Sequence, residues 1–237
     1  MPMIPLRDDL PTKRFPFITV ALLITNIAVF AYELSLSDEE LLALIATWAF
    51  TPAHLAAEPT SPAVLLTLLT AMFLHGGWLH IAGNMLYLWI FGNNIEDRFG
   101  HLGFLAFYLV TGVAATLAHL GVEGASDIPL LGASGAIAGV LGAYLVLYPR
   151  TRVVVAIPIF FIIELARVPA AFVIGFWFLV QVIQGAGSIL ADTAGGGVAW
   201  WAHVGGFVAG IIVTVPAWIA EWRKRRNRRK RRFTASR

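Results

Sequence analysis

One serine in an otherwise apolar stretch has the neighbours that a catalytic hydroxyl needs. Ser134 lies between Gly132 and Gly135 in the run from Leu131 to Tyr148. A serine hydroxyl is a poor nucleophile at neutral pH, so it requires a base in hydrogen-bond reach and donors that face the developing oxyanion. Glycines allow a sharp turn and a close approach of the backbone to a substrate. The pattern is compatible with acyl transfer, although a glycine-serine motif alone is weak.

Three further polar residues occur in apolar surroundings. His80 and Asn84 are four residues apart, which places them on one face of a helix, and His203 lies near the start of another apolar run. Imidazole and amide groups are costly in hydrocarbon unless they have partners or line a wet cavity, so they are candidates for function. A histidine that only caps a neighbouring helix is the structural alternative. At about 1.5 Å of rise per residue, these groups and Ser134 lie within two turns of their helix starts and can share one depth.

Small residues offer a way to bring two of these helices together. Four glycines form two faces with four-residue spacing, of the kind that membrane helices use for close packing. They are Gly135, Gly139, Gly206 and Gly210. If these faces pack together, His203 can reach Ser134, so the packing interpretation of the glycines and the catalytic one support each other.

Composition identifies a multi-pass membrane protein. Of 237 residues, 58% are hydrophobic and only 13% charged, compared with about a quarter charged in soluble domains. The chain has no cysteine, which excludes disulfides and thiolate chemistry. The net charge of +3 comes mostly from the tail Arg223 to Arg232, so the basic balance is local and gives little support for nucleic-acid binding. The first apolar run is long and lacks a cleavage site, unlike a signal peptide.

Hydropathy and charge together predict six spans. The expected spans are Phe17 to Leu34, Trp78 to Phe91, Leu102 to Leu120, Gly132 to Tyr148, Pro169 to Gln184 and Ala199 to Ile219. With the N-terminus inside, all 17 Lys and Arg lie on the inner side, as the positive-inside rule requires. Both termini are therefore expected in the cytoplasm, with the polar groups near the outer face.

The fold class predicted is an all-α polytopic membrane protein. Residues 1–16 form a cytoplasmic segment, residues 17–219 the membrane domain, and residues 220–237 a basic cytoplasmic tail. Val64 to Leu74 is expected in the membrane interface. Pro149 to Val168 is interpreted as an interfacial loop because Pro158, Glu164 and Arg167 interrupt it. The tail is expected to bind anionic lipid.

Taken together, the motifs resemble those of the rhomboid intramembrane serine proteases. The matching stretches are His80-Ile-Ala-Gly-Asn84, Gly132-Ala-Ser134-Gly135, and Ala202-His203-Val-Gly-Gly206-Phe-Val-Ala-Gly210, in the family's order. The resemblance covers roughly Phe17 to Ile219 and implies a six-helix bundle.

The resemblance also implies a reaction. Ser134 would be the nucleophile and His203 its general base, a dyad without a carboxylate. His80, Asn84 and the backbone near Gly132 and Ser134 would form the oxyanion site. Neither a cofactor nor a metal is implied. The substrates would be transmembrane proteins, cleaved from the extracytoplasmic side of a cell membrane, with a bacterial plasma membrane favoured. Glu96 and Arg98 resemble the family's E-x-R motif, an expected structural ion pair.

Two positions depart from the family pattern. The Trp-Arg pair of the first outer loop is absent before His75, and Ala138 stands where some members carry an aromatic that stacks on the catalytic histidine. His203 must therefore be oriented by other contacts. Asp127 and Asp192, in outer loops, are candidates for a third member of the site.

Two other functions remain as alternatives. One is a rhomboid-like protein without protease activity that binds membrane-protein clients. The other is a transporter or metal-handling protein that uses His75, His80 and His203, although the chain has no H-E-x-x-H motif and no recognisable repeat halves. The sequence does not specify the substrate, the oligomeric state or any regulation.

Overall fold

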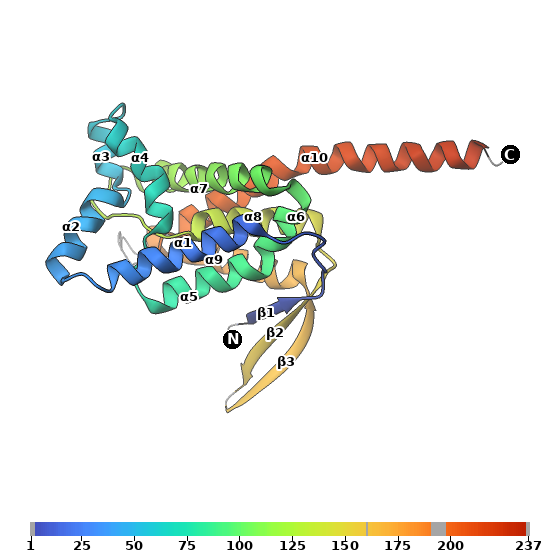
Figure 1. Cartoon of the computed structure of the whole chain (residues 1–237), viewed down its shortest axis with the longest axis horizontal. Helices are drawn as coiled ribbons and strands as arrows, with labels where there is room; N and C mark the ends of the chain where they lie inside the picture. Colours follow the sequence, from blue (N-terminus) through green and yellow to red (C-terminus); the bar gives the residue numbers. More distant parts are fainter. Residues whose placement is uncertain (1–2, 160, 191–197, 236–237) are drawn as a thin grey trace.

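The structure, a computed structural model, is a helical bundle with a small sheet on one side (Figure 1). It describes residues 3–159, 161–190 and 198–235. The helices of the bundle are α1 (Phe17–Glu33), α5 (Trp78–Tyr87), η2 (Leu88–Gly92), α6 (Asn93–Phe99), α7 (His101–Glu123), α8 (Ser134–Leu147), α9 (Ala170–Leu190) and α10 (Trp200–Ala235). The π-helical turn η2 joins α5 and α6 without a break, so these three form one helical stretch.

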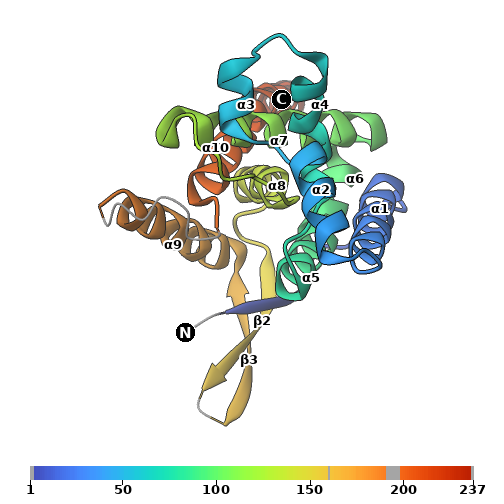
Figure 2. The same cartoon turned by 90° about the vertical axis from the view of Figure 1, so that its left-hand side faces the viewer.

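Helix α8 is the centre of the bundle. Figure 2 shows it surrounded by α5, α7, α9 and α10, all of which contact it. Its residues from Ala136 to Tyr144 are buried without interruption. A helix that is apolar all round requires such a position. With 14 residues it is about 21 Å long, shorter than the ~30 Å hydrocarbon core.

Several helices are apolar and long enough to cross a membrane. Within the described residues, α7, Ala170–Ile189 of α9 and Trp200–Ala220 of α10 meet this condition. A fourth crossing is obtained if Pro62–Phe73 and Trp78–Phe99, which meet at an angle of 82°, count as one span. Helices α1 and α8 are apolar but shorter. The chain is therefore a multi-pass membrane protein, while the six-span count stays a prediction.

A segment of short helices covers one end of the bundle and holds the loop before α8. It comprises α2 (Asp38–Trp48), α3 (Pro52–Ala57), α4 (Pro62–Thr70) and the 3₁₀ turn η1 (Ala71–Phe73). Ser37 and Glu40 form a capping box that begins α2. Phe50 and Leu130 exchange two backbone hydrogen bonds, and the Gly132 N–H donates to the Ala71 carbonyl at 2.8 Å. These bonds fix the loop that leads to Ser134.

The prediction of an all-α chain is wrong in one region. Strands β1 (Ile4–Asp8), β2 (Arg152–Ile159) and β3 (Ile162–Pro169) form an antiparallel sheet with β2 in the middle. Strands β2 and β3 occupy the segment that was expected as an interfacial loop, and β1 lies in the N-terminal segment, for which no strand was expected. β-Branched residues dominate β2 and favour extended backbone. Pro158 is tolerated because β1 pairs only as far as Ala156, so the missing N–H interrupts no ladder with β1.

A half-buried carboxylate attaches the first strand to the bundle. Asp8 accepts hydrogen bonds from the Tyr144 hydroxyl of α8 and from the Asn94 amide of α6, the latter at 2.6 Å. Burial raises the pKa of Asp8 above its usual value, although the hydrogen bond from Tyr144 acts in the opposite direction. The sheet is thus connected to the core through α6 and α8.

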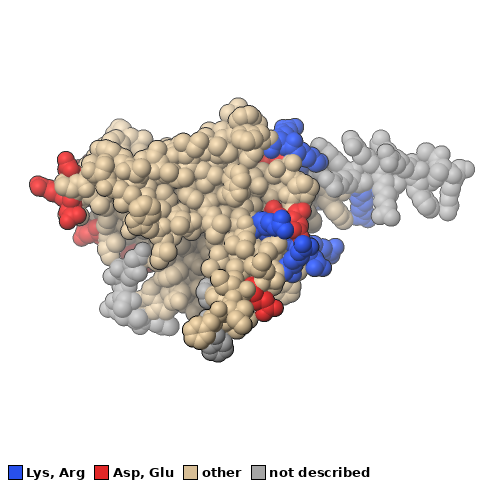
Figure 3. Space-filling view, turned by 60° about the horizontal axis from the view of Figure 1, so that its bottom comes forward, with Lys and Arg blue, Asp and Glu red and all other residues tan. Residues whose placement is uncertain are grey.

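Charged side chains are distributed unequally between the two ends. In the view of Figure 3, Lys and Arg gather at the end from which α10 leaves the bundle, and Asp and Glu dominate the opposite end. We call the former the basic end, defined by Lys13, Arg14 and Arg98, which line one cavity with Tyr148, and by the exposed Arg150 and Arg152, which follow Tyr148 in the chain. Glu96 is buried nearby and accepts bonds from the backbone of Ile18 and Thr19, at the start of α1, and from His101. It therefore caps the start of α1; its expected ion pair with Arg98 stays a prediction.

Candidate active site

Ser134 is the first residue of the central helix α8. The turn before it depends on Gly132, whose φ of 118° is unfavourable for other residues. A Cβ at Gly132 would also lie 2.6 Å from the ring of His80. Because α8 is short, its first residue lies inside the bundle instead of at its surface. The free N–H groups at the start of a helix carry partial positive charge, which suits an oxyanion.

Ser134 and His203 are hydrogen-bonded to each other. The distance from Ser134 Oγ to His203 Nε2 is 2.8 Å, although the two residues are 69 positions apart in the chain. His203 lies in the first turn of α10, which packs against α8. This is the geometry that a nucleophile and its base require.

The close approach of α8 and α10 depends on glycine at several positions. A Cβ on Gly206 would collide with the carbonyl oxygen of Gly135, and a Cβ on Gly210 with that of Gly139. A Cβ on Gly142 would collide with the carbonyl oxygen of Phe207. Backbone thus packs directly on backbone where the serine and the histidine meet, as small-residue faces allow.

A glutamine on α9 forms a hydrogen bond with the second ring nitrogen of His203. Gln181 Oε1 lies 2.7 Å from His203 Nδ1, and its amide nitrogen donates to the Trp177 carbonyl at 3.2 Å. This second bond sets the amide so that its oxygen faces the histidine. His203 then carries its proton on Nδ1 and leaves Nε2 as the acceptor for Ser134. The rings of Trp177 and Trp200 lie 5.8 and 6.2 Å from that of His203.

Asn84 belongs to a second network of hydrogen bonds. Its amide nitrogen lies 3.0 Å from Nε2 of His75, whose Nδ1 lies 3.3 Å from the Phe73 carbonyl. The His75 backbone N–H donates to the carboxylate of Glu33 at 3.1 Å. His75 therefore accepts one amide hydrogen and leaves the other available. The rings of His75 and His80 are 5.1 Å apart.

One cavity brings these groups together. Its volume is about 620 Å³, and its lining includes His80, Asn84, Ser134, Trp177 and His203. Gly132 lies close to this cavity, because a Cβ built on it would be 2.6 Å from the His80 ring. The candidates that the sequence placed at one depth thus surround one space, large enough for a segment of peptide.

Two members of the site were not predicted from the sequence. Gln181 is a buried amide in an apolar helix, a signal that was available in the sequence. His75 was considered only for the transporter or metal-handling alternative, whereas here it bonds Asn84. Of the two acids considered as a third member, Asp127 is exposed and Asp192 lies outside the described residues. No metal-binding group of three His, Asp or Glu occurs within the described part of the chain.

These observations define a multi-pass membrane protein with a serine–histidine pair inside its helical bundle. Residues 62–219 match the family model described as Rhomboid domain. The chain belongs to the rhomboid family.

Relatives with rhomboid names match stretches of different length in this chain. Rhomboid protein 1, mitochondrial, of Saccharomyces cerevisiae is 27% identical over 205 residues, which cover 81% of this chain and 51% of the relative. Rhomboid protease GluP of Bacillus subtilis is 35% identical over 159 residues, 63% of this chain and 26% of the relative. RHOMBOID-like protein 5 of Arabidopsis thaliana is 36% identical over 78 residues, which cover 33% of this chain and 25% of the relative. The matches thus cover about a quarter to a half of each relative.

Proposed function

We propose that this protein is an intramembrane serine endopeptidase that hydrolyses peptide bonds in or near the transmembrane segments of other membrane proteins. The observation that carries the proposal is the 2.8 Å hydrogen bond between Ser134 Oγ and His203 Nε2, next to a cavity of about 620 Å³. Membership of the rhomboid family supports the same reaction class.

The first half of the reaction uses the dyad directly. His203 Nε2 takes the proton of Ser134 as Oγ attacks the carbonyl carbon, and a tetrahedral oxyanion forms. The protonated His203 then donates this proton to the leaving amine as the C–N bond breaks, which produces an acyl-enzyme. In the second half, water gives a proton to His203 and attacks the ester carbon. The bond from that carbon to Ser134 Oγ then breaks, His203 returns the proton to Oγ, and the carboxyl product leaves.

The oxyanion needs donors that are in place before the reaction. We assign this role to the free amide hydrogen of Asn84, to the His80 ring and to the backbone at the start of α8, with Gly132 shaping that turn. Donors fixed in a site of low dielectric stabilise developing charge strongly, because they need no reorganisation during the reaction.

The proposed orientation places both termini in the cytoplasm and the cavity toward the opposite side. Its support is the charge asymmetry of the chain, with six spans formed by α1, α5 to α6, α7, α8, α9 and α10. In this arrangement residues 17–219 form the membrane domain and residues 220–237 a basic tail toward anionic lipid. A cell membrane, such as a bacterial plasma membrane, is the proposed location.

Substrate helices must unfold locally before cleavage. Backbone groups in a membrane helix are bonded to one another, so a scissile carbonyl is accessible only where the helix opens. Gly or Pro near the cleavage site should therefore favour hydrolysis.

The second candidate function is a rhomboid-like protein that binds membrane-protein clients without cleaving them. This function is retained as a candidate because some relatives are named as rhomboid-like proteins and not as proteases. A fluorophosphonate serine probe separates the two functions. Labelling of wild type in detergent supports the protease, whereas no labelling, while an active rhomboid reacts in the same detergent, supports client binding.

Gln181→Ala is expected to lower kcat about 10- to 100-fold with little change in KM, because the imidazole loses the bond that fixes its orientation and tautomer. Gln181→Glu keeps an acceptor oxygen and is expected to recover much of the rate. Gln184→Ala, an exposed position on the same helix, is the matched control. Initial rates on a fluorescent transmembrane substrate measure all three. Equal rates for wild type and Gln181→Ala would contradict the positioning role.

Asn84→Ala is expected to lower the cleavage rate by about 10² to 10³, the usual effect of removing one oxyanion donor. Some activity should remain because the backbone donors persist. The measurement is single-turnover cleavage, with the thermal midpoint recorded to verify folding. An unchanged rate, or a loss as complete as that of Ser134→Ala in a folded protein, would argue against this role.

A further inference from the structure

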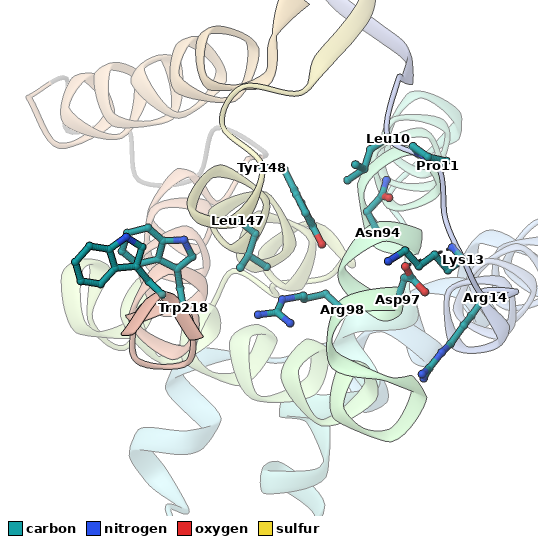
Figure 4. A pocket seen from close by; sticks show the side chains of 11 residues that line it. Leu10, Pro11, Lys13, Arg14, Asn94, Asp97, Arg98, Leu147, Tyr148 and Trp218 are labelled. Carbon is teal, nitrogen blue, oxygen red and sulfur yellow. Dashed lines mark hydrogen bonds between the residues drawn. The ribbon is translucent and has the colours of Figure 1, made fainter. Parts of the chain in front are cut away.

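A second cavity lies at the basic end of the bundle, remote from Ser134. Its volume is about 550 Å³, and its walls come from the N-terminal segment, α6, the end of α8 and α10. Figure 4 shows Arg98 and Tyr148 extending into the space between α6 and α10. Lys13 and Asp97 lie together on one side of the cavity, and Trp218 lies on the other. The reaction at Ser134 uses none of these residues.

The charge of the lining selects an anion. Lys13, Arg14 and Arg98 supply three positive charges and Asp97 one negative charge, a net charge of +2. Arg226 does not line the cavity, but its guanidinium lies 5.3 Å from the centre of the ring of Trp222, which does. Guanidinium groups match phosphate oxygens with paired hydrogen bonds, and a lysine adds a compact charge.

Two tryptophans in the lining indicate that the anion is part of a membrane lipid. Trp218 and Trp222 line the cavity from one face of α10, four residues apart, and their side chains are 42% and 48% exposed. They lie around the point where the apolar part of α10, which ends at Ala220, meets the basic tail. Tryptophan is favoured at this depth of a membrane, beside the glycerol and phosphate groups of lipids.

We propose that this cavity binds the phosphate of an anionic phospholipid headgroup. Lys13, Arg14 and Arg98 would contact the phosphate, and the two tryptophans would contact the glycerol region. The ligand would join the N-terminal segment to α6 and α10, and so stabilise the folded state in proportion to its occupancy. This proposal is independent of the proposed protease activity.

A lipid-binding measurement on the full-length protein in detergent tests the site. The thermal midpoint is recorded during titration with dihexanoyl phosphatidylglycerol, with dihexanoyl phosphatidylcholine and, separately, with inorganic phosphate. The pocket variant carries Lys13→Glu and Arg14→Glu. The control carries Arg150→Glu and Arg152→Glu, which change the net charge equally at the same end but do not line the cavity.

The expected result is a saturable rise of the midpoint with phosphatidylglycerol, and little or no rise with phosphatidylcholine or phosphate. The pocket variant should bind the anionic lipid about tenfold more weakly, because two charge-assisted contacts become repulsive. The control should differ from wild type by less than about twofold, since exposed charges outside the cavity are screened. If the charge reversals prevent folding, Lys13→Gln with Arg14→Gln replaces them and should show a smaller loss in the same direction.

Three results would overturn the proposal. Equal losses in the pocket and control variants would indicate general attraction to a basic surface, and no loss in the pocket variant would exclude the cavity. If inorganic phosphate raised the midpoint with the same affinity as the lipid, the ligand would be a soluble phosphate compound and not a headgroup.

Discussion

Ser134→Ala and His203→Ala are each expected to abolish cleavage, with losses of roughly 10⁴-fold or more. In the proposed reaction the serine supplies the attacking oxygen, and the histidine takes the serine's proton and then donates it to the leaving group. Their 2.8 Å hydrogen bond means that removing either leaves the other without a function in the reaction. The double variant should therefore be no slower than either single one, because residues that act as a unit are not additive.

Labelling by a fluorophosphonate probe and cleavage of a transmembrane substrate check this prediction together. Both variants should remain folded and soluble in detergent, since Ser134→Ala removes one oxygen and His203 lines a cavity. Residual cleavage by either purified variant above the level of the double variant would exclude the dyad. Labelling of Ser134→Ala would show that another residue reacts with the probe.

The candidate residues could be found from the sequence because each is a polar group in an apolar run. Placing such groups in hydrocarbon costs free energy, so their presence in the sequence already indicates that they share a cavity. The structure brings Ser134, His203, His80 and Asn84 to one cavity. Rhomboid membership, which the motifs indicated, is confirmed by the match over residues 62–219.

The residues that support the dyad could not be assigned in the same way. Gln181 is polar and buried, but it lies 22 positions before His203, and nothing local relates α9 to α10. Contacts between helices depend on rotation about each helix axis and on crossing geometry, which hydropathy does not determine. The same limit applies to the contact of His75 with Asn84.

The sheet was missed because its signals conflict. Pro158, Glu164 and Arg167 interrupt the apolar pattern of residues 152–169, and such residues favour a loop in a membrane protein. The third strand, β1, lies about 150 residues earlier in the chain and pairs with only part of β2. Pairing over this separation is set by tertiary contacts, among them the bonds of Asp8 to Asn94 and Tyr144.

Gly206→Ala is expected to slow the proposed cleavage about a hundredfold, because it increases the distance between two helices. The added methyl group would collide with the carbonyl oxygen of Gly135, so α8 and α10 must separate. Gly135 is adjacent to Ser134, and Gly206 is three residues after His203 on the same helix. The separation therefore lengthens the bond between the nucleophile and its base. A misplacement of about 1 Å costs roughly 10²-fold in rate, and overpacking costs about 1 to 3 kcal/mol of stability.

Cleavage rate and thermal midpoint, measured together, distinguish this effect from simple unfolding. At temperatures well below its midpoint, Gly206→Ala should remain folded yet cleave and label about a hundredfold more slowly than wild type. Gly121→Ala on α7 is the matched control, because a Cβ there meets nothing within 4 Å. It should keep full activity and gain up to about 1 kcal/mol from helix propensity. Wild-type rates in Gly206→Ala would mean that the helices yield without disturbing the dyad, and that close packing serves stability alone.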